Sequence, residues 1–227
     1  TKENHNRLNQ VFFIQEQKIH QRYAKILLPT HGVFDESRYF VPGEEKLILE
    51  LQGLRIGMTI CEDVWHVPGK ITSTFRINPL QTLKTEKLDL LINMSASPFE
   101  KQKIYFRQKL FRDVSEYLDC SVAFCNQWGG QDHLVFDGTS FVYSKKEKKY
   151  YQGLSFEKDQ LIFECSKDNL RVLSHKETLA ETLPNKDAMT VIKKALCCGL
   201  KDYCTKLGFE KVLVALSGGI DSSVVAC

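Results

Sequence analysis

The sequence predicts an α/β protein, with a sandwich-like domain up to about residue 168 followed by the first helix and strand of a second α/β domain. Two observations predict this fold class. Short apolar runs typical of strands alternate with segments whose apolar residues recur at helical spacing. From residue 166 the apolar periodicity gives way to a charged stretch, after which a helical pattern leads into an apolar run and a glycine-containing turn.

Composition limits the possible partners. The 227 residues carry 31 Lys and Arg against 28 Asp and Glu, a formal net charge of +3, and 43% are hydrophobic. This balance is typical of a globular protein and argues against a dedicated nucleic-acid surface. No apolar stretch approaches the ~20 residues needed to span a bilayer, so we expect no membrane partner and a cytoplasmic location. The eight cysteines show no Cys-x-x-Cys pair and no zinc-site spacing, which favours reduced, mostly structural thiols.

Polar turns and glycines separate the first expected strands. Residues 11–15 and 18–25 have the pattern of two strands joined by a short polar turn, and residues 47–51 and 54–60 flank Gly53. Each pair is therefore expected to form two neighbouring strands. Between the pairs lie two prolines and two glycines, which predict a loop.

The clearest helix in the sequence covers residues 101–118. Its apolar residues recur at three- and four-residue intervals, the pattern of an amphipathic helix. A helix is also expected at 76–85, with buried strands at 88–93 and 121–126. A strand-rich finish to the domain is expected at 139–143, 149–151 and 160–164.

Charged residues dominate the stretch from 166 to 186, which predicts a linker or a strap across a surface. We accordingly expect a first domain at 1–168, a linker at 169–186 and the start of a second domain at 187–227. The second domain is expected to open with a helix ended by Gly208, followed by a strand at 212–216.

A turn of composition Ser217-Gly-Gly-Ile-Asp-Ser-Ser follows that expected strand. Its glycines permit close backbone approach to an anion, and the following helix N-terminus supplies unpaired N–H groups. No Gly-Lys-Ser/Thr follows, so this is not a Walker loop, and it suits cradling a pyrophosphate. Asp221 is a candidate ligand for a magnesium ion that bridges phosphate oxygens. The alternative is a glycine-containing turn without a ligand.

This turn resembles the loop of the ATP pyrophosphatase family, whose members adenylate a substrate and release pyrophosphate. Together with residues 200–211 it is most similar to the NAD synthetases of that family. The resemblance implies a Rossmann-like domain, ATP and Mg²⁺ as substrate and metal, and deamido-NAD as the second substrate. The implied ATP-binding residues are Ser217, Gly218, Gly219, Ile220, Asp221 and Ser222, with Asp221 also the implied metal ligand.

The run 54–60 ends at Cys61-Glu-Asp, and a cysteine at the exit of a buried strand is where a sharp turn presents a nucleophile. A cysteine packed in the core is the alternative.

Upstream, Lys25 leads directly into Ile-Leu-Leu-Pro, so its burial would need a reason. A nearby thiolate and carboxylate would be one, because the cation lowers the thiol pKa and stabilises an oxyanion. A solvent-facing strand lysine is the alternative.

Residues 25–43 and the Cys-Glu-Asp turn resemble the nitrilase superfamily, whose amidases use a Glu–Lys–Cys triad in an αββα sandwich. Residues 93–99 and 126–140 are similar to the glutaminase domains of glutamine-dependent NAD synthetases. The resemblance implies a nitrilase-like αββα sandwich, incomplete at its N-terminus. It is followed by the first helix, strand and P-loop of a Rossmann-like ATP-pyrophosphatase domain.

The resemblance also implies roles for individual residues. Cys61 is the expected nucleophile, Lys25 the oxyanion stabiliser and Glu36 the supporting glutamate, with no metal in this site. The implied glutamine-binding residues are His31, Ser97 and Lys103, where His31 stands in place of the tyrosine usual in the family. The triad's general-base glutamate belongs, in the family pattern, to a segment upstream of residue 1.

The implied reaction is hydrolysis of glutamine, whose ammonia serves the ATP-dependent amidation of deamido-NAD to NAD, with release of AMP and pyrophosphate. A homo-oligomer is the implied assembly. The chain lacks an initiator Met and stops shortly after the loop, so we expect a fragment of that enzyme. Two alternatives stay open: a stand-alone nitrilase-type amidase, and an inactive truncated piece.

Overall fold

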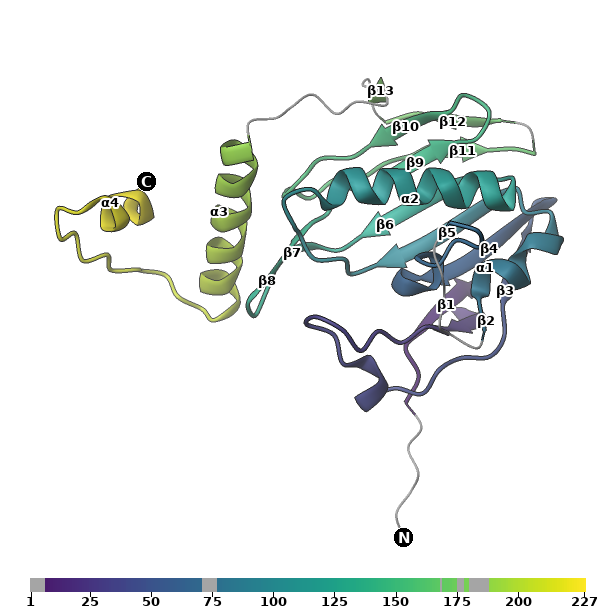
Figure 1. The fold of residues 1–227 in the computed structure, drawn as a ribbon, viewed down its shortest axis with the longest axis horizontal. Coiled ribbons are helices and arrows are strands. Elements are labelled where there is room, and N and C mark those ends of the chain that lie inside the picture. Colours follow the sequence, from purple (N-terminus) through teal and green to yellow (C-terminus); the bar gives the residue numbers. More distant parts are fainter. Residues whose placement is uncertain (1–6, 71–76, 168, 175–177, 180–187) are drawn as a thin grey trace, which may run out of the picture.

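The computed structural model describes residues 7–70, 77–167, 169–174, 178–179 and 188–227, and Figure 1 shows its ribbon. Its centre is a seven-stranded mixed sheet in the order β13-β10-β9-β6-β5-β4-β3. Strands β4, β5 and β6 are parallel, and the other neighbours pair antiparallel. The strands are β3 (Leu47–Leu51), β4 (Leu54–Ile60), β5 (Leu90–Ser95), β6 (Ser121–Asn126), β9 (Phe141–Ser144), β10 (Lys149–Gln152) and β13 (Thr178–Leu179).

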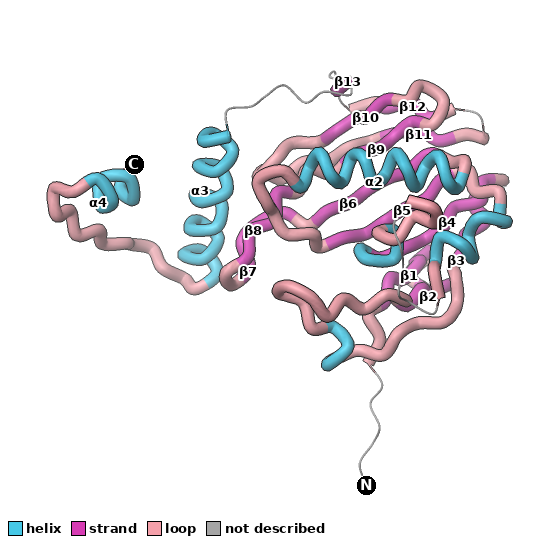
Figure 2. The backbone as a smooth tube through the Cα atoms, in the orientation of Figure 1, coloured by secondary structure: helices cyan, strands magenta, loops and turns pink. Residues whose placement is uncertain are grey.

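Two helices cover one face of this sheet, α1 (Pro79–Leu83) and the long α2 (Lys103–Leu118) (Figure 2). Successive side chains of a strand point to opposite faces, so Phe141 and Phe124 of the sheet meet α2 while their neighbours do not. Phe111 of α2 lies against both, with ring centroids 4.7 Å from Phe124 and 5.4 Å from Phe141. This aromatic cluster is the centre of the helix-side core.

Two antiparallel ribbons cover the other face. They are β1 (Gln10–Gln15) with β2 (Lys18–Ala24), and β11 (Phe163–Cys165) with β12 (Leu170–Val172). Tyr23 and Leu170 are each 2% exposed because they pack on the side chains that the sheet presents to this face. The result is a layer of helices, a sheet and a layer of strand ribbons, which is the sandwich-like arrangement that the sequence predicts.

A further hairpin joins the first unit to the second. Strands β7 (Trp128–Gln131) and β8 (Leu134–Asp137) extend from the sheet to α3 (Ala188–Lys206) (Figure 1). The N–H of Gly130 donates to Asp202 Oδ2 at 2.8 Å, and Lys206 Nζ donates to the Gly130 carbonyl. A Cβ on Gly130 would lie 3.0 Å from the Cα of Gly199, so both glycines are needed for this close approach.

Most of the expected elements are present. The strand pairs before residue 61, the strand at 121–126 and the long helix are confirmed within one or two residues. The helix expected at 76–85 is shorter, since α1 ends at Leu83 and a 3₁₀ turn follows, and residue 76 lies outside the described residues. Within the stretch expected to be a linker, β12 pairs with β11 and β13 with β10, so these parts join the first unit. Residues 175–177 and 180–187 of that stretch lie outside the described residues.

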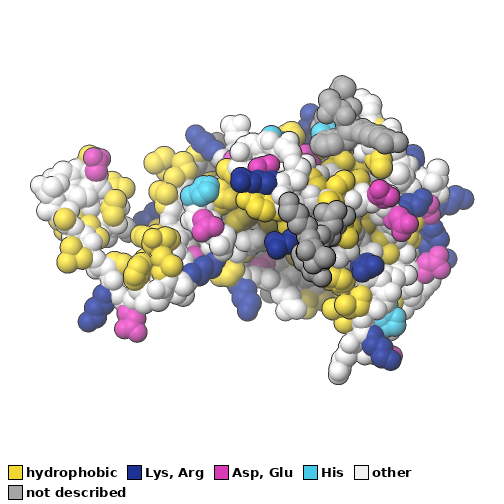
Figure 3. Space-filling view, turned by 90° about the horizontal axis from the view of Figure 1, so that it is seen from below, with side chains coloured by type: hydrophobic (Ala, Val, Ile, Leu, Met, Phe, Trp, Pro, Cys, Tyr) yellow, Lys and Arg dark blue, Asp and Glu magenta, His cyan; other side chains and the backbone are white. Residues whose placement is uncertain are grey.

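The strand expected at 212–216 is not formed. A strand satisfies its backbone N–H and C=O groups through a neighbour, and among the described residues none pairs with this segment. Its apolar side chains are exposed, Leu213 at 93%, and Figure 3 shows many hydrophobic side chains gathered over the α3–α4 end of the protein. The helix α4 (Ile220–Ala226) begins directly after the glycine turn. None of the helices in the described part of the chain combines the length and apolar character needed to cross a bilayer.

Candidate active site

Three parallel strands bring their carboxyl ends to one edge of the sheet, which is where α/β proteins place their ligands. Cys61 follows β4, Ser97 lies two residues beyond β5, and Asn126 ends β6. At Cys61 the chain turns sharply into a 3₁₀ helix, Cys61–Val64. The φ angle of Cys61 is +44°, a left-handed conformation that costs a non-glycine residue ~1–3 kcal/mol and requires support from its surroundings.

Lys25 is buried, with 1% of its surface exposed, so the alternative of a solvent-facing lysine is wrong. Its Nζ donates to Glu36 Oε1 at 2.6 Å, and Glu36 opens the 3₁₀ turn Glu36–Arg38 of the loop after β2. The Lys25 carbonyl accepts the N–H of Gly43 at 2.8 Å, which ties both ends of this loop together. The buried Lys25 ammonium thus forms an ion pair with the Glu36 carboxylate, and both charges act on the Cys61 thiol.

The surroundings of Cys61 act in opposite directions on its acidity. Burial raises the pKa of the Cys61 thiol, the nearby Lys25 ammonium lowers it, and the Glu62 carboxylate raises it again. A hydrogen bond with Ser95 lowers the pKa and the Glu36 carboxylate raises it. The net shift is upward, so the resting thiol is protonated at neutral pH and needs a base before it can attack.

Alkylation of Cys61 by iodoacetamide is expected to show an apparent pKa above that of an ordinary cysteine, because thiolate is the reacting form. In Lys25→Met the apparent pKa should rise further, since the cation that lowers it is gone. The measurement is the alkylation rate against pH, followed by mass spectrometry of the peptide that carries Cys61. Lys46→Met, which removes a lysine paired with Glu86, is the matched control. An unmoved profile in Lys25→Met would contradict the effect of the Lys25 ammonium on the Cys61 thiol.

The loop after β5 is held by a buried polar network. The N–H of Ser97 donates to Asn126 Oδ1 at 2.8 Å, and the Ser97 carbonyl accepts from Asn126 Nδ2 and Arg107 Nη2, both at 3.2 Å. Arg107, 1% exposed, also pairs with Asp137 through two hydrogen bonds of 2.9 Å. The Ser97 Oγ atom is buried and has no hydrogen-bond partner among the described residues, which leaves it available to a ligand.

Replacing Arg107 with methionine is expected to destabilise the fold by about 3–5 kcal/mol, because Asp137 would remain buried without its partner. The free energy of unfolding in urea measures this, with Lys145→Met as a control for loss of an exposed ion pair. A loss in Arg107→Met no larger than that of the control would contradict the structural role of this pair.

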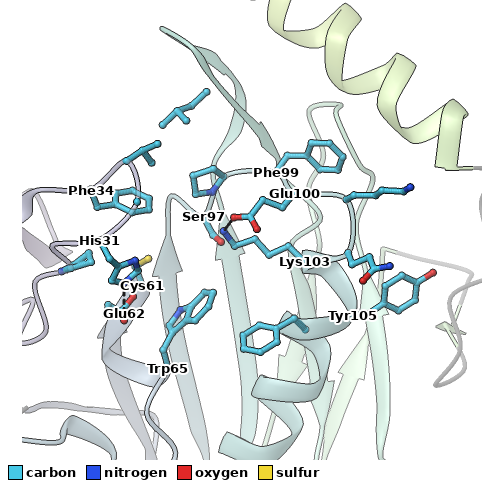
Figure 4. A pocket seen from close by; sticks show the side chains of 18 of the residues that line it. His31, Phe34, Cys61, Glu62, Trp65, Ser97, Phe99, Glu100, Lys103 and Tyr105 are labelled. Carbon is cyan, nitrogen blue, oxygen red and sulfur yellow. Dashed lines mark hydrogen bonds and ion pairs between the residues drawn. The ribbon is translucent and has the colours of Figure 1, made fainter. Parts of the chain in front are cut away.

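A cavity of about 1180 Å³ opens above these strand ends (Figure 4). Cys61 and Glu62 lie on one side and Ser97 on another. Trp65 and Phe106 also line the cavity, with their ring centroids 5.4 Å apart. The exposed His31 ring lies beside Glu62, with 3.7 Å between Nε2 and Oε1. On the far side, Lys103 Nζ pairs with Glu100 Oε1 at 2.5 Å and lies 5.9 Å from the Trp65 ring. The cavity thus combines a thiol, apolar walls and charged groups.

The expected phosphate loop lies apart from this cavity, at the end of the chain that carries α4 (Figure 1). Gly218 has a φ of +83°, which only glycine adopts without strain, and α4 begins after Gly219. Ser222 and Ser223 hydroxyls donate to the Gly219 carbonyl at 3.1 and 2.9 Å. Asp221 is exposed in the first turn of the helix. The backbone therefore has the glycine-turn-to-helix form expected of the loop.

Comparison with known proteins places the first unit in a family. Residues 2–167, more than half of the chain, match the sequence pattern of carbon–nitrogen hydrolases. The chain belongs to the carbon–nitrogen hydrolase family. Beyond this carbon–nitrogen hydrolase unit, residues 192–227 match the NAD synthase family. The family resemblance drawn from the Cys-Glu-Asp turn and the glycine loop is thereby confirmed.

Curated relatives of this carbon–nitrogen hydrolase include glutamine-dependent NAD(+) synthetases of Thermotoga maritima and Aquifex aeolicus. The first is 34% identical over 96% of the chain and the second 36% identical over 90% of it. The chain spans 41% and 39% of their respective lengths. Among solved structures, the glutamine-dependent NAD+ synthetase of Acinetobacter baumannii, in complex with ADP, matches with a TM-score of 0.82. It is 30% identical, and the match covers 97% of this chain and 39% of that one.

A second solved structure, a glutamine-dependent NAD(+) synthetase of Cytophaga hutchinsonii, matches with a TM-score of 0.70 at 22% identity over 96% of this chain and 35% of that one. It supports the fold. The nitrilase-like fold expected from the sequence is confirmed by the family match and by these structures.

The structure brings four of the predicted glutaminase residues of this carbon–nitrogen hydrolase to one cavity: Cys61, His31, Ser97 and Lys103. Lys25 is buried and Glu36 half-buried; neither lines the cavity, but the charges of both act on the Cys61 thiol. The ATP-loop residues 217–222 are not part of this site.

Sequence reasoning missed the network that supports Ser97, namely Asn126, Arg107 and Asp137. Asn126 and Asp137 stand in the string that carries the family resemblance, so a signal was present there. No sequence signal marked Arg107 as a buried residue, because an arginine on an amphipathic helix is ordinarily exposed.

Proposed function

We propose that this chain supplies the glutaminase site, and the first part of the ATP-binding unit, of a glutamine-dependent NAD synthetase. One observation carries the proposal: the buried Lys25 pairs with Glu36, and both charges act on a cysteine at a strained turn, in a chain that continues into an NAD synthase segment. The curated relatives that this chain matches include glutamine-dependent NAD(+) synthetases.

In the proposed glutaminase reaction the Cys61 sulfur attacks the carbon of the glutamine side-chain amide, and the thiol proton passes to a carboxylate base. The C–S bond forms while the carbonyl oxygen becomes an oxyanion beside the Lys25 ammonium, which stabilises it. When the C–N bond breaks, the proton leaves with ammonia and a γ-glutamyl thioester remains. Attack by water on this thioester then gives glutamate and restores the thiol. No metal takes part in these steps.

The cavity can orient glutamine for this reaction. Ser97 Oγ at the cavity wall has no hydrogen-bond partner within the described part of the chain and can both donate and accept, and Lys103 offers a cation for the glutamine carboxylate. His31 lies beside Glu62 and so brings an imidazole to the same side as the thiol. We propose these three residues as the glutamine contacts.

The ammonia is proposed to serve a second reaction, the ATP-dependent amidation of deamido-NAD to NAD. Residues 217–222 would cradle the phosphates of ATP through their backbone N–H groups. Asp221 fits a magnesium ion that accompanies ATP, because Mg²⁺ in nucleotide sites is held by one or two carboxylates together with phosphate oxygens. On the family resemblance we further propose a cytoplasmic homo-oligomer.

Glutamine hydrolysis and NAD formation, measured with and without ATP and deamido-NAD in the protein as its coding sequence encodes it, test the proposal. NAD is expected to form from glutamine only when ATP and deamido-NAD are both present. Full glutaminase activity without either substrate, and no NAD under any condition, would support a stand-alone amidase and overturn the synthetase assignment.

A further inference from the structure

Asp63 makes the most complete set of hydrogen bonds near the thiol, although it does not line the cavity. Its side chain is fully buried. Oδ1 accepts the backbone N–H groups of Ile26 at 3.1 Å and Leu27 at 2.8 Å. Oδ2 accepts the Tyr23 hydroxyl at 2.7 Å and the N–H of Ile60 at 2.9 Å. An ionised carboxylate offers about four acceptor sites, and here every one of them is used.

These four donors come from two segments that carry the proposed catalytic groups. Tyr23, Ile26 and Leu27 bracket Lys25 on both sides along the chain. Ile60 immediately precedes Cys61, whose left-handed backbone needs support. Asp63 itself lies in the same 3₁₀ turn as the thiol. One side chain therefore ties the backbone around the lysine to the backbone around the cysteine.

We propose that Asp63 is a positioning residue for the glutaminase reaction, because its carboxylate holds the Lys25 segment and the Cys61 turn at a fixed separation. This inference rests on the proposed function, since it concerns the reaction of that site. Asp63 acts through Lys25 and Cys61 and does not contact glutamine in the cavity. A misplacement of catalytic groups by ~1 Å can cost about a hundredfold in rate, so fixing this separation has a direct kinetic value.

Only an acceptor fits this position. In Asp63→Asn, one oxygen can still accept from Ile26 and Leu27, but the amide NH₂ then faces the N–H of Ile60, donor against donor. Burial raises the pKa of the Asp63 carboxyl to about 6, and its hydrogen bonds act in the opposite direction and limit the rise. The ionised form, which only accepts hydrogen bonds, is therefore present at neutral pH. The substitution therefore removes the link to the Cys61 turn while keeping the shape of the side chain.

Asp63→Asn in the protein as its coding sequence encodes it is expected to lower kcat for glutamine hydrolysis about a hundredfold, with KM changed less than about threefold. The cavity contacts are untouched, which is why KM is spared. The alkylation profile of Cys61 should move to higher pH, because Lys25 is no longer held where it lowers the thiol pKa. In Asp63→Asn with Lys25→Met, the profile should equal that of Lys25→Met alone, since Asp63 acts through the lysine.

Asp89→Asn is the matched control, because Asp89 Oδ2 also accepts a strand N–H, that of Arg55, at the opposite end of β4. It should leave kcat and the alkylation profile unchanged. Should Asp63→Asn fail to fold by circular dichroism, Tyr23→Phe provides the test, as it removes one of the four bonds and keeps the ring. It is expected to lower kcat about threefold to tenfold, with a smaller shift of the same profile.

A folded Asp63→Asn with unchanged kcat and profile would overturn the proposal, and so would a raised KM with an unmoved profile. In the Tyr23→Phe arm, an unchanged kcat would overturn it. The alkylation arm needs no glutamine. If the unchanged protein hydrolyses no glutamine, the proposed function fails, while the profile still decides whether Asp63 positions Lys25 against Cys61.

Discussion

Replacing Cys61 with alanine is expected to lower glutamine-supported NAD formation about a thousandfold or more, while ammonium-supported formation stays unchanged. The thiol is the only nucleophile we propose for the amide, so no thioester forms without it. The phosphate loop lies at the far end of the chain from the cavity, so amidation with free ammonia should not depend on the thiol. The measurement is the rate of NAD formation with glutamine and with an ammonium salt.

The control for this substitution is Cys125→Ala, which removes an exposed cysteine on β6 that does not line the cavity. Both nitrogen sources should support that variant equally well. Loss of ammonium-supported formation in Cys61→Ala would contradict the separation of the two sites. Retention of glutamine-supported formation would contradict the role of the thiol.

Replacing Asp221 with alanine is expected to lower NAD formation about a hundredfold or more with either nitrogen source. The exposed carboxylate at the start of α4 is the group we propose to hold magnesium against the ATP phosphates, and both routes use the same adenylation. The measurement is again the rate of NAD formation, now with the release of pyrophosphate followed in parallel. Cys61 alkylation should be unaffected, since the thiol lies in the other unit.

Glu210→Ala is the matched control, because Glu210 is an exposed carboxylate in the segment between α3 and the loop. It should retain activity with both nitrogen sources. Ammonium-supported NAD formation that persists in Asp221→Ala would contradict the proposed part of this residue in binding ATP or its metal.

Local patterns in the sequence predicted those elements whose periodicity is set by one buried face. The long helix and the strands on either side of Gly53 belong to this class. The hairpin of β7 and β8 was missed because Gly129 and Gly130 weaken any strand pattern, and the reason for the glycines is contact with α3. The strand at 212–216 was wrongly expected, since an apolar run becomes a strand only where a neighbour completes its hydrogen bonds.

The candidate site was predictable where one residue stands at a strand end, and less so where several distant segments meet. Cys61 follows an apolar strand, so its place in the sequence is enough to suggest a nucleophile. Spacing could not decide whether Lys25 is buried, because the answer depends on Glu36 across a loop. Asp63 gave no signal as a link, since three of its four hydrogen-bond partners lie 36 to 40 residues earlier in the chain.

In the proposed function, the nitrogen released at Cys61 becomes the amide nitrogen of NAD. Glutamine labelled with heavy nitrogen at its side-chain amide, supplied with ATP, magnesium, deamido-NAD and an excess of unlabelled ammonium at neutral pH, tests it directly. Mass spectrometry of the product should find the label in most of the NAD made by the unchanged protein and in none made by Cys61→Ala. Unlabelled NAD from the unchanged protein would contradict the claim.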